Sequence, residues 1–200
     1  MNLLSSGAGV ILVITVLTSL VGLFFRPELI ARSMFRPYAI ARGHDYFTII
    51  TSGIVHADLA HLLFNMMTFY FFAFPLERRI GTPMFITLYV VGLVLSEART
   101  YSKHRDHPEY ASLGASGAIS AVLFASIVYF PGMSLYVMFI PVPIPAPLFG
   151  VGYLLYCWYA GKRAEGHINH DAHLYGAMAG LLFVAVTNPS AYAGLLHLVG

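Results

Sequence analysis

The sequence predicts an all-α integral membrane protein that folds as a bundle of six transmembrane helices. Of its 200 residues, 58% are hydrophobic and only 10% are charged, whereas about 25% of residues are charged in a soluble domain. The mean hydropathy is +0.73. A helix that crosses a bilayer needs roughly 20 apolar residues. The chain offers six candidate apolar segments, at 8–25, 59–76, 83–96, 115–130, 147–160 and 171–187.

The connections between these segments are too short to hold an additional soluble domain, so we expect residues 1–200 to form a single domain. The formal net charge of +2 is too small to argue for a nucleic-acid partner, and no basic cluster is interleaved with aromatic residues, so none is expected. The single cysteine, Cys157, excludes an intrachain disulfide and is expected to pack in the core. We interpret segment 8–25 as a retained first helix, because Met1–Gly9 carries no Lys or Arg.

The connections carry local signals of their own. Between Arg26 and Ala57, arginines alternate with apolar residues, a composition that suits the lipid headgroup layer. Asp58 is a plausible N-cap for the second helix. The run from Pro141 to Pro147 has a proline at every second position and cannot be helical throughout, so it separates the fourth and fifth segments.

Four polar residues stand out because they lie near the starts of helices two, four and six. Ser116 lies between glycines at the start of the fourth helix, where its backbone N–H faces the positive end of the helix dipole. His61 and Asn65 are four residues apart and share a face of the second helix, and His173 lies in or near the first turn of the sixth. Alternate helices of a serpentine bundle begin on the same side of the membrane. We therefore expect all four residues in one leaflet.

Small residues on the fourth and sixth helices strengthen this expectation. They repeat every four residues, which lets two helices approach closely in lipid. The fourth helix carries Gly117, Ala121 and Ala125, and the sixth carries Ala172, Gly176 and Gly180. Ser116 and His173 each lie one residue from the top of a stripe. Packing the stripes together would therefore bring hydroxyl and imidazole within reach of each other.

These residues suit nucleophilic acyl transfer. His173 would take the proton of Ser116 as the hydroxyl attacks a carbonyl, and would then return it to the leaving amine. The backbone N–H of Ser116 and the side chains of His61 and Asn65 could hold the oxyanion. Asp171 lies two residues from His173 and should point elsewhere, so we expect a dyad without a third acidic member.

The sequence resembles the rhomboid family of intramembrane serine proteases, in its minimal six-helix bacterial-type form. Three motifs carry the resemblance, in the family's order and spacing, and the match covers the whole six-helix core. They are H-x4-H-x3-N at His56, His61 and Asn65, G-x-S-G at Gly114, Ser116 and Gly117, and A-H-x2-G at Ala172, His173 and Gly176. Leu76–Gly81 also resembles the family's charged end of the second helix.

The resemblance implies a serine endopeptidase with Ser116 as nucleophile, His173 as base, and His61 and Asn65 as oxyanion-stabilising side chains. His56 and the glycines of the motifs and stripes (Gly114, Gly117, Gly176 and Gly180) would have supporting structural roles. The sequence departs from the family at two places. Many bacterial members have a tyrosine one turn after the serine, packed on the catalytic histidine, where this chain has Ser120. Asp45-Tyr46-Phe47 also replaces a common Trp-Arg dipeptide.

The resemblance further implies that the substrates are membrane proteins with a transmembrane helix. It also implies that the chain itself is a multi-pass protein of a cell membrane, here the bacterial inner membrane. No cofactor or metal is expected. Leu148–Ala160 and Gly161–Asp171 are the candidate gate and lid. Family topology places the N-terminus in the cytoplasm and the site outside, whereas the Lys and Arg distribution favours the reverse orientation. The sequence does not define the oligomeric state.

Two alternative functions remain open. His167, His170 and His173 are spaced by three residues and could share a helical face, as in a histidine-based metal transporter or channel. Against this function, intramembrane carboxylates are nearly absent, and cation pathways usually supply them. The other alternative is an inactive rhomboid-like protein that binds membrane segments, against which the intact Ser116 and His173 argue.

Overall fold

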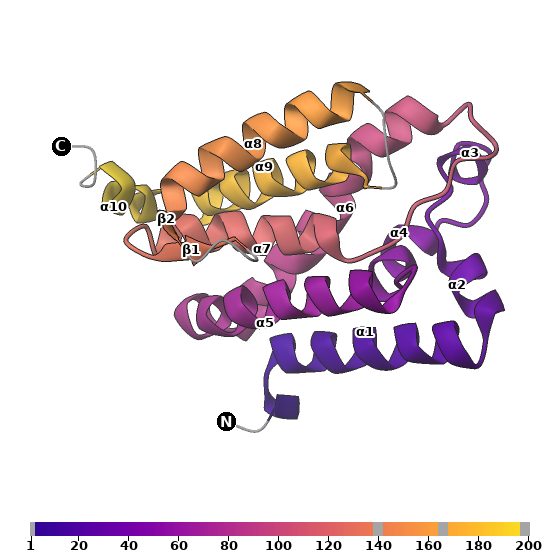
Figure 1. The fold of residues 1–200 in the computed structure, drawn as a ribbon, viewed down its shortest axis with the longest axis horizontal. Helices are drawn as coiled ribbons and strands as arrows, with labels where there is room; N and C mark the ends of the chain where they lie inside the picture. The colour runs from indigo at the N-terminus through magenta and orange to yellow at the C-terminus, as the bar shows by residue number, and fades with distance from the viewer. Residues whose placement is uncertain (1–2, 138–141, 164–167, 197–200) are drawn as a thin grey trace.

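Six long helices lie side by side and form a membrane bundle (Figure 1). The computed structural model describes residues 3–137, 142–163 and 168–196. The long helices are α1 (Gly7–Phe24), α5 (Leu59–Ile80), α6 (Thr82–His104), α7 (Ser116–Tyr129), α8 (Ala146–Arg163) and α9 (His170–Thr187). Each coincides with one of the six predicted apolar segments, so the all-α prediction is confirmed.

Short elements precede, join and follow the long helices. They are η1 (Leu3–Ser5), α2 (Pro27–Ser33), α3 (Pro37–Ile40), α4 (Thr48–Thr51), η2 (Ser52–Ile54), η3 (Pro189–Tyr192) and α10 (Ala193–Leu196). A small antiparallel hairpin of β1 (Ser134–Tyr136) and β2 (Pro143–Pro145) lies between α7 and α8, with Leu135 opposite Ile144. The alternating prolines explain why β2 is extended. Pro147 is tolerated in the first turn of α8, because the backbone N–H that proline lacks would have no intrahelical acceptor there.

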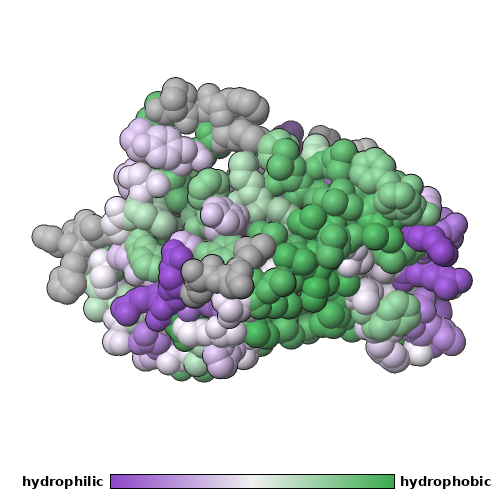
Figure 2. Space-filling model, turned by 90° about the horizontal axis from the view of Figure 1, so that it is seen from below, coloured by the Kyte–Doolittle hydropathy of each residue, from purple (hydrophilic) through white to green (hydrophobic). Residues whose placement is uncertain are grey.

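Three of the helices, α1, α5 and α6, are each long and apolar enough to cross a membrane. A fourth span is formed if α9 is counted together with the segment 189–195, which bends away from it by 116°. Helix α7 is apolar but has only 14 residues. Seen from the side of α1, a broad hydrophobic band crosses the molecule, and hydrophilic side chains gather toward its two ends (Figure 2). That α7 and α8 also cross the bilayer stays a prediction.

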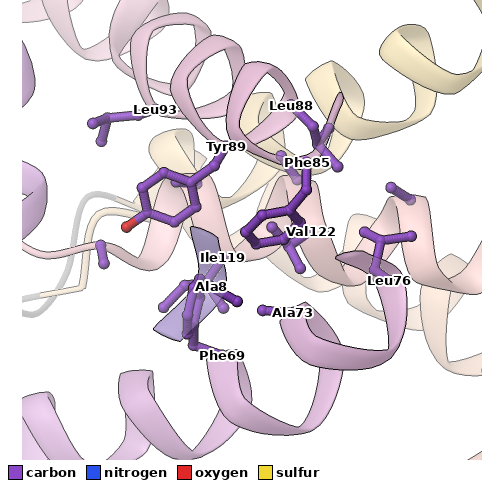
Figure 3. Packing of buried hydrophobic residues seen from close by; sticks show 14 of the residues in the cluster. Ala8, Phe69, Ala73, Leu76, Phe85, Leu88, Tyr89, Leu93, Ile119 and Val122 are labelled. Carbon is purple, nitrogen blue, oxygen red and sulfur yellow. The ribbon is translucent and has the colours of Figure 1, made fainter. Parts of the chain in front are cut away.

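The hydrophobic core lies where α5, α6 and α7 meet. Phe69 of α5 packs edge-on against Tyr89 of α6, with ring centroids 5.6 Å apart, and the ring centroid of Phe85 of α6 lies 6.2 Å from that of Phe69 (Figure 3). Helix α7 is the central helix, because every residue from Gly117 to Val128 is buried. Ser116 therefore stands at the end of the most enclosed helix of the bundle.

Helices α5, α7 and α9 begin at the same end of the bundle (Figure 1), as the serpentine arrangement predicts. Two of these N-termini have side-chain caps. Asp58 accepts a hydrogen bond from the backbone N–H of His61, as predicted, and Asn169 accepts one from Ala172. Helix α7 lacks such a side-chain cap, so the backbone amides of its first turn are left without an intrahelical acceptor at this end of the bundle.

Helices α7 and α9 make the most extensive contact of any pair in the described part of the chain. A Cβ atom built on Gly176 would strike the backbone carbonyl of Gly117, and one built on Gly180 would strike that of Ala121. The two backbones thus touch along the predicted stripes of small residues. This contact sets the spacing between the helices that carry Ser116 and His173.

Glu77 joins the opposite end of α5 to its neighbours. Its carboxylate accepts hydrogen bonds from the backbone N–H groups of Gly7 (2.7 Å) and Ala8 (2.9 Å), and from the hydroxyl of Thr82 (2.6 Å). A carboxylate is favourable at the N-terminus of a helix because it meets unpaired amides and the positive end of the dipole. Glu77 therefore anchors the start of α1 to the α5–α6 turn.

The helix contact predicts that Gly180→Ala destabilises the protein whereas Gly152→Ala does not. The new methyl at Gly180 meets a backbone carbonyl, and overpacking of this kind typically costs about 1–3 kcal/mol. Gly152 on α8 has nothing within 4 Å of the added atom. Thermal unfolding in detergent measures both variants. Equal melting temperatures for the two would contradict close packing of α7 on α9.

Candidate functional site

A cavity of about 750 Å³ lies at the end of the bundle where α5, α7 and α9 begin. Ser116, His173, His61 and Asn65 all line it, so the structure brings the four predicted residues to one place. The rest of the wall comes from the loop before α5, the end of α6, the loop before α7, the end of α8 and the start of α9. The cavity is therefore built by segments far apart in the sequence.

Ser116 is the first residue of α7 and is half-buried. The chain reaches it through Gly114, whose φ of +118° favours glycine. A Cβ atom on Gly114 would lie 2.7 Å from the ring of His61. Glycine is therefore required here for two reasons, the backbone conformation and the close approach of His61.

His56 is fully buried behind this loop. Its Nε2 accepts a hydrogen bond from the backbone N–H of Ala115 at 3.5 Å, and its Nδ1 lies 3.0 Å from the hydroxyl of Ser19 on α1. The Ser19 hydroxyl is also placed to donate to the carbonyl of Ile54. With Nε2 as acceptor, Nδ1 carries the proton and donates to Ser19. His56 thereby links α1 to the residue that precedes Ser116.

Burial, and to a smaller extent the neighbouring His61, lower the pKa of His56 from 6.5 to about 3, while Asp58 opposes the shift. Because the pKa is lower in the folded state, the unfolded chain binds the proton more readily. We therefore expect the stability contributed by neutral His56 to be complete above pH 6.5 and to be lost progressively as the pH falls toward 3.

Thermal unfolding in detergent at a series of pH values tests this expectation. The melting temperature of the parent should fall as the pH drops below 6.5, and His56→Gln should show a smaller fall because the glutamine does not titrate. A parent melting temperature that rises on acidification would show that His56 is not held neutral by its surroundings.

His61 and Asn65 face the cavity from the first turns of α5. The ring of His61 packs edge-on against that of His56, with centroids 4.9 Å apart. Asn65 is buried, and its Nδ2 has no hydrogen-bond partner within the described residues. A buried amide donor without an acceptor is energetically costly. Its position in the same cavity as Ser116 marks it as a donor available to an oxyanion.

His173 lies one turn after the N-cap of α9. The cap residue, Asn169, also donates from Nδ2 to the hydroxyl of Thr100 on α6 at 3.0 Å. Asp171 points away from His173, as the sequence predicts, and forms an ion pair of 2.8 Å with Lys103. Lys103 also donates to the carbonyl of Gly161. The ends of α6 and α8 and the start of α9 are therefore held together beside His173.

Tyr153 of α8 is a site residue that the sequence reasoning missed. Its ring stacks on that of His173, with centroids 6.3 Å apart and planes 16° from parallel, and its hydroxyl lies 3.3 Å from that of Ser120. Ser120 occupies the place where the sequence departs from the family pattern. An aromatic ring therefore reaches His173 from α8. The only signal in the sequence was the departure at Ser120 itself.

A second group of donors lies on the α8 side of His173. The ligand atoms of Cys157, His170 and His173 all lie within 4.8 Å of one another. The histidine set predicted for a transporter included His167, which lies outside the described residues. The candidate gate, Leu148–Ala160, lies within α8, whereas residues 164–167 of the candidate lid also lie outside the described residues.

The cavity holds the groups that acyl transfer uses. A hydroxyl at a helix start, an imidazole and an unpaired amide donor share one space, and the amides of the first turn of α7 lack intrahelical acceptors. The fold and the site together define a polytopic membrane protein with a serine–histidine cavity at one end of its bundle.

The comparisons agree with this class. The Rhomboid domain model matches residues 43–190. The chain is 30% identical to RHOMBOID-like protein 12, mitochondrial, of Arabidopsis thaliana over 65% of its length and 43% of the relative's. It is 36% identical to the putative rhomboid protease YdcA of Bacillus subtilis over 40% of the chain and 39% of the relative. With the presenilin-associated rhomboid-like protein, mitochondrial, of Mus musculus, it shares 29% identity over 92% of the chain and 50% of the relative.

The chain therefore belongs to the rhomboid family, whose members are rhomboid-type intramembrane proteases and rhomboid-like proteins. It spans half or less of the length of these three relatives. Two are named as mitochondrial and one is bacterial. The predicted location in a bacterial inner membrane stays a prediction.

Proposed function

We propose that the chain is a serine endopeptidase that cleaves transmembrane segments of membrane proteins inside the bilayer. The observation that carries the proposal is that Ser116, His173 and the unpaired Nδ2 of Asn65 line one cavity, in a chain of the rhomboid family. A structural role for the same residues would leave the buried amide of Asn65 unexplained.

In the proposed reaction, Ser116 attacks the carbonyl carbon of the scissile peptide. His173 accepts the hydroxyl proton and then donates it to the departing amine, which leaves an acyl-enzyme for water to hydrolyse. Because Asp171 is paired with Lys103, Ser116 and His173 work as a dyad. The ring of His173 must then be held in place by packing, and Tyr153 provides a packing surface.

The oxyanion that forms on the substrate would meet three kinds of donor. The amide of Asn65 is unpaired, the imidazole of His61 lies beside Gly114, and the N–H of Ser116 is at the start of α7. Donors fixed before the reaction stabilise the transition state without reorganising. His56 holds the preceding residue, Ala115, and so supports the loop that aims the Ser116 amide.

The site's place in the bundle supports the proposed substrate class. The cavity lies among helices that are apolar on their outer faces, so a membrane protein with a transmembrane helix can approach through lipid. Helix α8 is our candidate gate. Several of its residues are exposed, including Leu148, Val151 and Leu155, and it packs mainly on α9, with smaller contacts to α7 and to the β1–β2 hairpin.

Cleavage of a generic transmembrane substrate in liposomes tests the proposal. We expect Ser116→Ala and His173→Ala to lose cleavage, and Asn65→Ala to be slower by about two to three orders of magnitude, the usual effect of removing one oxyanion donor. A serine-directed fluorophosphonate should label the parent at Ser116.

The matched control is Ser126→Ala, which removes another buried serine from the same helix. Within the described residues its hydroxyl bonds only to the carbonyl of Val122 one turn earlier, so cleavage should persist. Cleavage that survives in folded Ser116→Ala would disprove the assignment of the nucleophile. A folded parent that neither cleaves nor takes up the fluorophosphonate would favour the rhomboid-like binding protein.

The contact between Tyr153 and His173 predicts a graded effect on kcat. Tyr153→Phe keeps the ring and should retain most activity. Tyr153→Ala should lower kcat by up to about tenfold, because an aromatic contact is worth about 0.5–1.5 kcal/mol and 1.36 kcal/mol changes a rate tenfold. The control is Tyr159→Ala, which removes an exposed tyrosine from the same helix. Equal kcat values for Tyr153→Phe and Tyr153→Ala would argue against positioning by the ring.

A further inference from the structure

We propose that Cys157, His170 and His173 form a site for a zinc-like divalent cation that inhibits the proposed protease by occupying its base. The inference rests on the proposed function and adds regulation to that site. One cysteine from α8 and two histidines from α9 contribute it, and their ligand atoms all lie within 4.8 Å of one another.

The donor set fits zinc. Thiolate sulfur and imidazole nitrogen bind zinc at about 2.3 Å and 2.0–2.1 Å, so two ligands of a tetrahedral ion lie about 3.5 Å apart. Closing a pair of ligand atoms from at most 4.8 Å to that spacing needs a shift of at most about 1.3 Å, which side-chain rotation can supply. Three protein ligands leave the fourth position for water, as in zinc sites that bind and release a ligand.

A second observation points to a ligand here. Nδ1 of His170 is buried and has no hydrogen-bond partner within the described residues. His170 also lines the cavity, so an ion can reach it from the same space that holds Ser116. The charged groups on the cavity wall are the carboxylates of Asp58 and Asp171 and the ammonium of Lys103, so the wall carries a net negative charge that favours a cation.

Binding here would remove the base, whichever nitrogen of His173 is used. A neutral imidazole has one nitrogen with a free lone pair and one that carries a proton. When the metal takes the free lone pair, the remaining nitrogen is a donor and can no longer accept the proton of Ser116. On binding, the Cys157 thiol releases its proton to solvent, and both histidines remain neutral.

Cobalt binding tests the site without depending on catalysis. Co²⁺ added to Ser116→Ala should produce the absorption band of a thiolate-bound cobalt ion, and zinc should displace it. Cys157→Ala should abolish the band and His170→Ala should weaken binding. His44→Ala, which removes an exposed histidine elsewhere, should bind as Ser116→Ala does. Each of these variants is combined with Ser116→Ala. Absence of the band in folded Ser116→Ala would overturn the proposal.

Cleavage assays then test inhibition. Zinc should inhibit the parent, and a chelator should restore it. Measured against each variant's own metal-free rate, Cys157→Ala and His170→Ala should need about tenfold or more zinc for half-inhibition, which corresponds to about 1.4 kcal/mol of binding free energy. Unchanged zinc sensitivity in both variants would refute the site. If cobalt binds but neither the parent nor any variant cleaves, the proposed protease function fails while the metal site stands. Metal uptake into liposomes would then favour the transporter alternative.

Discussion

The contact between the backbones of α7 and α9 is the constraint on which the rest of the site depends. Gly176 and Gly180 allow α9 to lie directly on the carbonyls of α7, where any side chain would collide. In lipid, packing and not the hydrophobic effect drives helix association, so such a close approach is the main source of specificity. It brings the first turns of both helices to one cavity. Ser116 and His173 are thus placed by residues that themselves do no chemistry.

Polar contacts at the two ends of the bundle hold this arrangement. At one end, Lys103 joins α6 to Asp171 of α9 and to the last turns of α8, while His56 joins α1 to the loop before Ser116. At the other end, Glu77 gathers the start of α1 and the turn between α5 and α6. Each of these contacts joins fixed partner atoms on different helices. Together with the packing of α7 on α9, they therefore define the register of the helices.

His173 lies between two environments. On one side it shares the cavity with Ser116 and Asn65, and on the other it meets Tyr153, Cys157 and His170. All but His170 of the second group come from α8, the candidate gate. A movement of α8 would therefore change both the packing of the ring and the spacing of the proposed metal ligands. The proposed regulation and the proposed gating would act on the same imidazole.

The sequence by itself determined the six helical segments, the cap at Asp58, the stripes of small residues and the set of four polar residues that share a cavity. These features are local or periodic, so composition and spacing carry them. Only the tertiary structure revealed Tyr153 on His173, the grouping of Cys157 with the two histidines, and the links made by Glu77 and Lys103. Each joins residues from different helices, and a helix rotation or shift that leaves the sequence pattern unchanged would break it. The sequence therefore predicts which faces are apolar or small, while the rotation and depth of each helix decide which polar atoms meet.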